Sequence, residues 1–239
     1  MTKLKIKNAL ISLTDKNKIE IVAKKLKELD INIISTGGTA KYLKSHSIDV
    51  IDITEITNFP EIFDGRVKSL HPKIFGGILY RRNNENDLKT INSLKIESID
   101  LVIVNLYKFD DARKKLSSHD KIIENIDIGG PSLIRSAAKN FAFTTVVVDI
   151  NDYDLLIEKL SSNEGIDLEY RKSLAAKAFN ITAEYDRSIS NWFINNDQPK
   201  LPETINLNLN KKIEMRYGEN PHQKAGLFTN INQQSKSGI

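Results

Sequence analysis

Short apolar runs alternate with longer amphipathic stretches over the first part of the chain. A short run of this kind is typical of a strand that is buried on both faces of a sheet. Between the first two runs, apolar residues recur at three- and four-residue spacing from Ile19 to Leu29, which predicts an amphipathic helix. Because strands and helices alternate, we predict an α/β three-layer sandwich with a mostly parallel sheet flanked by helices. The predicted strands lie at 8–13, 31–36, 48–53, 99–107 and 144–150.

The pattern changes after Ile150. Apolar residues from Leu174 to Trp192 share one face of a single long helix, which we predict to end near Phe193. The stretch after it is rich in amides and holds two prolines, which is typical of a linker. The segment that follows is too short to bury a core of its own. We therefore predict a first domain at 1–195, a linker at 196–212 and the start of a second domain at 213–239.

Composition limits the class of protein. The chain has 239 residues, a formal net charge of +4, 28% charged residues and no cysteine. It lacks an apolar run long enough to span a bilayer, and its first residues lack the pattern of a secretory signal, so we expect a cytoplasmic protein with no membrane partner. The mild positive charge suits a phosphorylated small molecule better than a nucleic acid. The histidines are scattered without the spacing of metal ligands, so we predict no metal site.

Two consecutive strand ends carry the residues of an anion site. "STGGTA", Ser35 to Ala40, runs from a strand through two glycines into a helix, so it presents free N–H groups and the positive end of a helix dipole. "SLTDK", Ser12 to Lys16, ends the preceding strand. Each motif alone is also explained by an ordinary capped turn. Together they favour one phosphate site, because ligands of open α/β sheets lie outside the carboxyl ends of the strands.

A basic stretch, "DGRVKSLHP" at 64–72, adds two cations. Arg66 is suited to gripping a phosphate through two bonds, and Lys68 is a charge that burial converts into an acid–base group. A solvated basic loop is the simpler interpretation. The interleaved apolar residues, such as Val67 and Leu70, favour a loop that is held against the body of the protein and therefore an anion site.

Two further motifs, "NLYKF" and "DIGGP", complete the candidate chemistry. Asn105 and Tyr107 close the strongest predicted strand, where a ligand is expected to lie. Asp127 comes directly before a second glycine turn that opens a helix, and there it is suited to accept a proton or to hold an amine. Lys139 follows in the same helix, where it also suits the negative end of the helix dipole.

In their order and spacing, these motifs resemble the IMP cyclohydrolase domain of a bifunctional purine-biosynthesis family, AICAR transformylase/IMP cyclohydrolase. The resemblance covers about residues 5–195, and "RYGENPHQ" at 216–223 resembles the opening of the family's transformylase domain. It implies a fold similar to methylglyoxal synthase. It also implies the ring closure of 5-formamidoimidazole-4-carboxamide ribotide (FAICAR) to IMP and water, with no cofactor or metal.

The resemblance further implies roles for individual residues. Lys139 falls on the family's proton donor or acceptor, and Lys68, Tyr107 and Asp127 fall on residues that assist it. Our hypothesis is that Lys139 and Asp127 move protons while Lys68 and Tyr107 stabilise the oxyanion of the intermediate. The predicted substrate-binding residues are Ser12, Thr14, Asp15, Lys16, Ser35, Thr36, Gly37, Gly38, Thr39, Arg66, Val67, Ser69, Val104, Asn105, Ile128, Gly129 and Gly130.

Two departures from the family pattern affect these expectations. Lys108 stands where the family usually has proline, which we expect to loosen the loop that carries Tyr107. Arg216 and Tyr217 match AICAR-binding positions of the transformylase domain, but we expect the catalytic residues of that domain to be absent from this chain. We therefore expect no formyl transfer here. The cofactor 10-formyltetrahydrofolate would serve only the complete protein, which the resemblance implies is a homodimer.

Two other classes of protein stay open. Methylglyoxal synthase shares the fold and the phosphate turn, but its site is built on aspartate and histidine and lacks the basic stretch. A non-catalytic regulatory module of the same fold would need the phosphate-binding turn, but not Lys68, Tyr107 and Lys139 together.

Overall fold

The computed structural model describes residues 3–107, 109–115, 118–162, 164–196, 209–220 and 222–230. The chain divides into two compact units, Met1–Asp186 and Arg187–Ile239. The first unit contains a five-stranded sheet and the second contains a two-stranded sheet.

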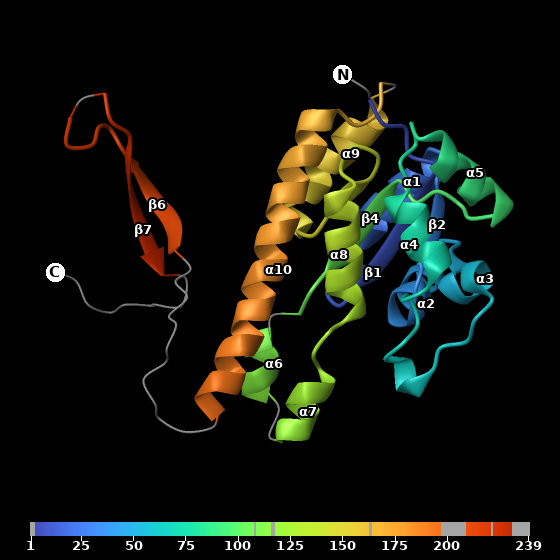
Figure 1. The fold of residues 1–239 in the computed structure, drawn as a ribbon, viewed down its shortest axis with the longest axis horizontal. Coiled ribbons are helices and arrows are strands. Elements are labelled where there is room, and N and C mark those ends of the chain that lie inside the picture. The colour runs from blue at the N-terminus through green and yellow to red at the C-terminus, as the bar shows by residue number, and fades with distance from the viewer. Residues whose placement is uncertain are drawn as a thin grey trace. The chain divides into compact units, whose positions relative to one another are not determined.

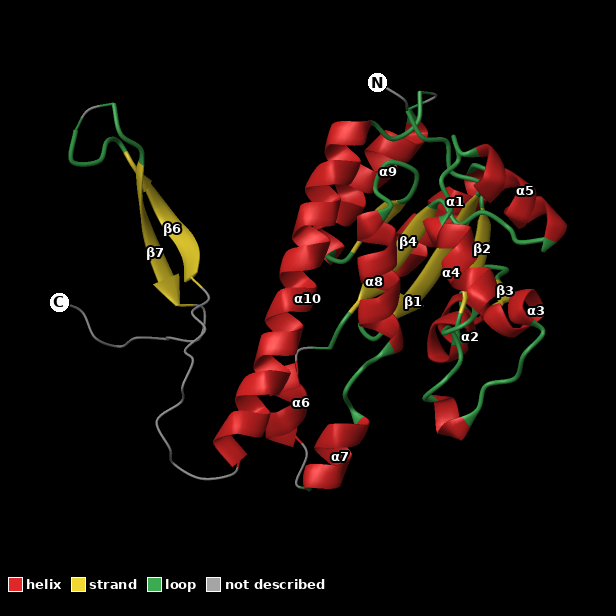
Figure 2. Cartoon of the chain, in the orientation of Figure 1, coloured by secondary structure: helices red, strands yellow, loops and turns green. Residues whose placement is uncertain are grey.

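All strands of the larger sheet run parallel, in the order β3-β2-β1-β4-β5 (Figure 2). The central strands consist mostly of buried apolar residues, which is why they stand out as apolar runs in the sequence. The chain moves outward from β1 to β3 and then returns to the other side of β1 with β4, so the sheet has its topological switch point between β1 and β4. The strands are β1 Asn8–Leu13, β2 Asn32–Ser35, β3 Ile51–Asp52, β4 Leu101–Asn105 and β5 Thr145–Val147.

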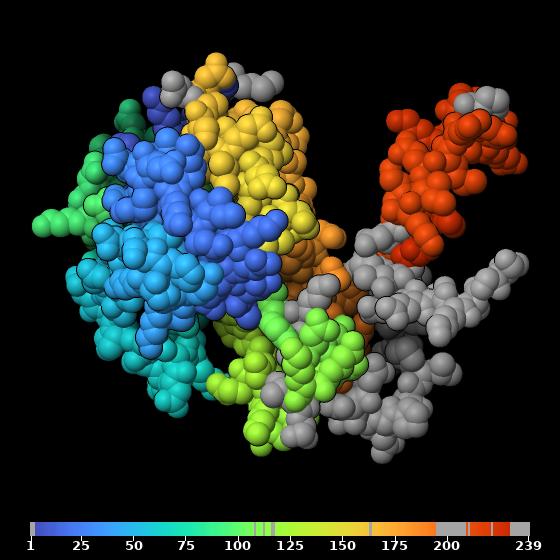
Figure 3. Space-filling view, turned by 180° about the vertical axis from the view of Figure 1, so that it is seen from behind, coloured from blue at the N-terminus to red at the C-terminus, as the bar shows by residue number. Residues whose placement is uncertain are grey.

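Helices cover both faces of this sheet. Helices α4 and α8 lie in front of it in Figure 1, whereas α1 and α9 lie side by side on the opposite face, which Figure 3 shows. The predicted three-layer α/β sandwich with a parallel sheet is therefore confirmed. The helices are α1 Ile19–Glu28, α2 Gly37–Ser45, α3 Ile53–Thr57, α4 Pro72–Leu79, α5 Glu85–Ser93, α6 Phe109–Lys115, α7 His119–Glu124, α8 Gly129–Lys139, α9 Tyr153–Ser161 and α10 Leu168–Asn196.

The strand predicted at 48–53 is shorter than expected, because a helix begins inside it. Asp52 caps α3 by accepting a hydrogen bond from the Thr54 N–H at 3.0 Å. In return, the Glu55 carboxylate accepts a hydrogen bond from the Asp52 N–H at 2.9 Å. This reciprocal capping box ends the strand after two residues and starts the helix.

A buried carboxylate joins the start of β1 to the start of β4. Asp100 is only 3% exposed, and it accepts hydrogen bonds from the Lys7 N–H at 2.7 Å and the Asn8 N–H at 3.0 Å. It also pairs with the Arg82 guanidinium at 2.5 Å. The carboxylate thus accepts from two backbone donors and is the charged partner of Arg82, whose guanidinium also donates to the Tyr80 hydroxyl and the Phe143 carbonyl.

We expect Asp100→Asn to lower the free energy of unfolding by about 2 kcal/mol, because the Arg82 guanidinium would lose its charged partner in a largely buried setting. Urea unfolding followed by circular dichroism measures the change. Asp120→Asn, the same substitution on the exposed surface of α7, serves as the control and should leave the midpoint of the unfolding transition unchanged. Superimposable unfolding curves for Asp100→Asn and the unchanged protein would contradict the assigned role.

The second unit contains an antiparallel hairpin of β6, Leu209–Met215, and β7, Ala225–Asn230. Strand β6 begins inside the predicted linker. Several apolar side chains of the hairpin are about half exposed, among them Ile213, Leu227 and Phe228. A lone two-stranded sheet is marginal by itself. Within the ranges described above, no helix has both the length and the apolar character needed to cross a membrane.

Candidate functional site

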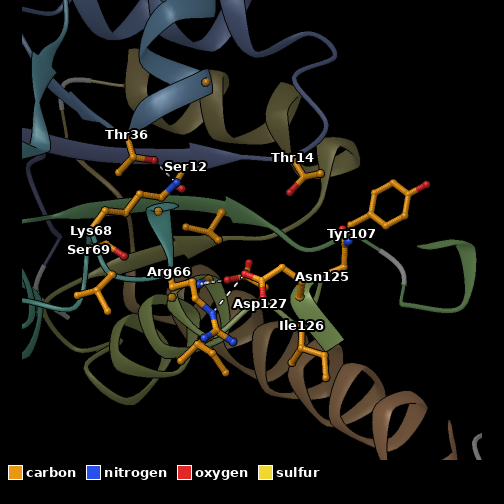
Figure 4. Close-up of a pocket in the computed structure, with 18 of the residues that line it drawn as sticks. Ser12, Thr14, Thr36, Arg66, Lys68, Ser69, Tyr107, Asn125, Ile126 and Asp127 are labelled. Atoms are coloured by element: carbon orange, nitrogen blue, oxygen red, sulfur yellow. Dashed lines mark hydrogen bonds and ion pairs between the residues drawn. The ribbon is translucent and has the colours of Figure 1, made fainter. Parts of the chain in front are cut away.

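A pocket of about 1020 Å³ opens at the carboxyl ends of β1, β2 and β4, at the switch point of the sheet (Figure 4). Most of the predicted site residues line it. They come from five separate segments of the chain, which the fold brings together. The predicted residues at the wall are Ser12, Thr14, Thr36, Gly38, Thr39, Arg66, Val67, Lys68, Ser69, Val104, Asn105, Tyr107, Asp127, Ile128, Gly129 and Gly130.

Hydroxyl groups connect the ends of β1 and β2. The Ser12 and Thr36 hydroxyl oxygens lie 3.0 Å apart. The Thr39 hydroxyl accepts a hydrogen bond from the Leu13 N–H at 2.9 Å and donates to the Leu13 carbonyl at 3.0 Å. The Ser35 hydroxyl is different, since it is fully buried and donates to the Ile11 carbonyl at 2.8 Å. Ser35 therefore holds two strands together and does not reach the pocket.

The side chain of Asn105 fixes the loop that follows β1. Its Oδ1 accepts hydrogen bonds from the Thr14 N–H at 2.8 Å and the Asp15 N–H at 3.2 Å, and its Nδ2 donates to the Asp15 carbonyl at 2.6 Å. Lys16 donates to the Thr14 carbonyl at 3.2 Å. Asp15 and Lys16 thus shape this loop but lie outside the pocket wall.

Two helices begin at the pocket and direct their positive dipole ends toward it. Gly38 and Thr39 in the first turn of α2 line one side, and Gly129 and Gly130 in the first turn of α8 line another. The first N–H groups of a helix have no partner within the helix and attract anions. The pocket therefore has two places suited to negative charge.

The basic stretch forms a tight loop at one wall. Ile62 and Val67 pair across it, and Phe63, Asp64 and Gly65 have φ angles of 55°, 53° and 93°. The φ angle of Gly65 is one that side chains rarely adopt, so glycine is favoured there for conformation.

Lys68 and Arg66 leave this loop in different directions. The Lys68 ammonium lies 3.6 Å from the place that a Cβ would occupy at Gly37, and in Figure 4 its side chain reaches toward Ser12 and Thr36. Lys68 is half-buried. The exposed Arg66 side chain instead pairs with Glu124 of α7, with 3.2 Å between Nε and Oε1. Lys68 is therefore the cation at the start of α2.

Asp127 organises the turn that opens α8. Its Oδ1 accepts a hydrogen bond from the Gly130 N–H at 2.9 Å. A side chain at Gly130 would collide with the same carboxylate and would come within 2.8 Å of Leu106. The turn is therefore closed around Asp127, which is half-buried at the pocket wall.

Several polar residues at the wall were not predicted from the sequence, among them Lys115, Glu124 and Tyr185. Lys115 donates a hydrogen bond to the Tyr107 hydroxyl at 2.9 Å, and this bond raises the pKa of the Lys115 ammonium. Burial raises the pKa of the Tyr185 phenol. Nothing in the local sequence marks these residues, because Lys115 and Glu124 lie on short charged helices and Tyr185 falls on an apolar helix stripe.

The structure does not bring Lys139 to the pocket. It is exposed in the last turn of α8, whereas the pocket is at the first turn. Its assignment as a proton donor rests on the family resemblance alone. Arg216 and Tyr217 are exposed in the second unit, and Lys108 lies outside the described residues. No cluster of histidine, aspartate and glutamate suited to a metal ion occurs in the described ranges.

Two protein-family models match the chain. The model for the MGS-like domain matches residues 18–132, and the model for the AICARFT/IMPCHase bienzyme matches residues 137–239. The first match ends and the second begins within α8, the helix whose first turn lines the pocket.

Curated relatives align with nearly the whole chain. The bifunctional purine biosynthesis protein PurH of Clostridioides difficile (strain 630) is 53% identical over 226 residues, which cover 95% of this chain and 44% of the relative. PurH of Caldicellulosiruptor saccharolyticus is 49% identical over 226 residues, which cover 93% of this chain and 44% of the relative. The chain thus spans less than half the length of these relatives. A solved structure, described as the crystal structure of ForH, matches with a TM-score of 0.70 and 32% identity, over 78% of this chain and 96% of that chain.

Proposed function

The chain belongs to the family of bifunctional purine biosynthesis proteins, PurH, and we propose that its first unit is an IMP cyclohydrolase that closes the ring of FAICAR to give IMP and water. One observation carries the proposal. Two helix starts, the Lys68 cation and the Asp127 carboxylate face a single pocket. That combination suits a substrate with a phosphate at one end and a group that must lose a proton at the other.

We place the substrate's phosphate at the start of α2. The hydroxyls of Ser12 and Thr36, the N–H groups of the first helical turn and the Lys68 ammonium converge there. Charge-assisted bonds to phosphate are stronger than bonds between neutral groups. This placement assigns Lys68 to the phosphate, whereas the sequence-based hypothesis assigned it to the oxyanion of the intermediate.

Ring closure joins the carboxamide nitrogen of FAICAR to the formyl carbon of the same molecule. The nitrogen loses a proton, the formyl oxygen becomes a hydroxyl, and this hydroxyl gains a second proton and leaves as water. The formamide nitrogen then releases its proton as the new C=N bond forms. Holding the two reacting groups together supplies a proximity effect that reaches about 7 kcal/mol in favourable cases.

The residues near the start of α8 are suited to these proton transfers. We assign to Asp127 the removal of the carboxamide proton, because its carboxylate lies at the pocket wall and is fixed by the Gly130 N–H. The Gly129 N–H at this helix start and the Tyr107 hydroxyl are assigned to the developing oxyanion. Tyr107 is 39% exposed, and its ring points away from Thr36 in Figure 4. It would therefore act at the mouth of the pocket.

A single assay tests the proposal. Purified protein is incubated with FAICAR while purine absorbance is followed, and dihydroxyacetone phosphate is supplied to a parallel sample. We expect IMP from the first and no methylglyoxal from the second. Methylglyoxal production would favour the synthase instead, and IMP binding without turnover of either substrate would favour a regulatory module.

Glu124 is expected to weaken substrate binding, because it forms an ion pair with Arg66 and adds a negative charge to the pocket wall. Glu124→Gln should tighten IMP binding by roughly threefold, which is within the range of an exposed ion pair. Isothermal titration calorimetry measures the affinity. The increase should fade at high salt, since exposed charges are screened. Weaker binding in Glu124→Gln would show that the carboxylate supports the site instead.

A further inference from the structure

Tyr185 of α10 contacts the pocket from a distant part of the chain. Its hydroxyl accepts a hydrogen bond from the Asp127 N–H at 2.7 Å. The side chain is 7% exposed, and its ring forms a T-shaped contact with the ring of Phe109, with centroids 6.5 Å apart at an interplanar angle of 84°. Tyr185 lies in the segment matched by the bienzyme model, whereas Asp127 lies in the segment matched by the MGS-like model. The bond therefore joins these two segments at the pocket wall.

The two hydrogen bonds of Asp127 fix it at both ends. Tyr185 holds its backbone N–H, while its carboxylate accepts from the Gly130 N–H. The neighbouring turn is also crowded, because the Ser69 hydroxyl lies 2.9 Å from the place of a Cβ at Gly129. With the backbone of residue 127 held by a buried phenol on a long helix, the carboxylate has little freedom to move relative to the start of α8.

We infer that Tyr185 is a positioning residue, whose hydroxyl holds the Asp127 turn in the geometry needed for proton transfer. The inference rests on the proposed function. Precise placement matters for such a reaction, because a misplacement of about 1 Å can cost a hundredfold in rate. Loss of one hydrogen bond leaves the turn in place for part of the time, so a smaller loss is expected.

Tyr185→Phe removes only the hydroxyl and keeps the ring against Phe109. We expect kcat for FAICAR cyclisation to fall by about tenfold while KM changes by less than about threefold, in line with the loss of one buried hydrogen bond near the reacting group and not near the phosphate. We also expect the Asp127 amide to exchange its hydrogen at least about tenfold faster, since it loses its acceptor.

Tyr170→Phe is the matched control. Tyr170 lies on the same helix, and its buried hydroxyl has no hydrogen-bond partner among the described residues. This variant should match the unchanged protein in kcat, in KM and in exchange of the Asp127 amide. It thereby separates the effect of the bond from that of deleting a buried phenol oxygen.

Hydrogen exchange separates failure of this inference from failure of the proposed function. Faster exchange in Tyr185→Phe with unchanged kcat would overturn the positioning role, as would unchanged exchange of the Asp127 amide. If kcat also falls in Tyr170→Phe, the effect comes from a general loosening of α10. That result would overturn the positioning role of Tyr185 as well. If the unchanged protein does not cyclise FAICAR, the proposed function and the catalytic part of this inference both fail. The exchange comparison then still decides whether Tyr185 holds the turn.

Discussion

Asp127→Asn should lower kcat for FAICAR cyclisation by about a thousandfold, within the range attributed to a positioned acid or base. Asparagine has nearly the same shape as aspartate, and its Oδ1 can still accept the hydrogen bond from the Gly130 N–H. The turn at the start of α8 should therefore persist. What the amide cannot do is take the proton that the carboxamide nitrogen must lose. Steady-state kinetics with FAICAR measures the effect.

The affinity for IMP distinguishes this loss of chemistry from a damaged pocket. Calorimetry should give a dissociation constant for Asp127→Asn within about threefold of that of the unchanged protein, because the phosphate is proposed to bind at α2. Asp120→Asn, on the exposed face of α7, should alter neither quantity. Retention of more than one tenth of the turnover in Asp127→Asn would remove this carboxylate from the proposed mechanism.

The fold was predictable because its central strands carry a strong compositional signal. The runs that became β1 and β4 are buried on both faces, so most of their residues are apolar. The apolar run at 48–53 led us to predict a longer strand than the structure contains, because apolar residues also begin α3. There the side chains of Asp52 and Glu55 decide the outcome, through a local capping box that an apolar pattern does not report.

The pocket was predictable as far as it depends on strand ends and glycine turns. These features leave recognisable local motifs, and parallel strands bring them to one edge. The contact between Tyr185 and Asp127 was not predictable, because it joins residues 58 positions apart in the chain. In the sequence, Tyr185 fits the apolar stripe of a helix. Its hydroxyl gains a role only once α10 is placed against the pocket.

The geometry of α8 explains why Lys139 lies away from the pocket. A helix rises about 1.5 Å per residue, so a residue ten positions after Gly129 lies about 15 Å along the axis from the start of α8. That distance puts Lys139 at the opposite end of the helix from the pocket. The motif gives the order of residues, whereas the helix geometry determines which of them meet.

Lys68→Met should reduce kcat/KM for FAICAR by about a hundredfold, which is the cost of one strong charge-assisted bond, about 3 kcal/mol. Methionine keeps the length and apolar character of the lysine stem but lacks its charge. Because the Lys68 ammonium lies at the start of α2, beside the proposed phosphate, we expect most of the loss in KM. An ammonium that acted on the oxyanion would instead lower kcat with little change in KM.

Lys139→Met makes the comparison decisive, since it deletes the same charge from an exposed position in the same unit. The family resemblance implies that this substitution abolishes turnover, whereas the pocket geometry leads us to expect unchanged kcat and KM. If Lys139→Met is inactive while Lys68→Met is not, the motif has identified the catalytic lysine and the geometry of this chain has not. If only Lys68→Met is impaired, and through KM, the phosphate lies at the start of α2. Proton transfer is then left to the groups at the start of α8.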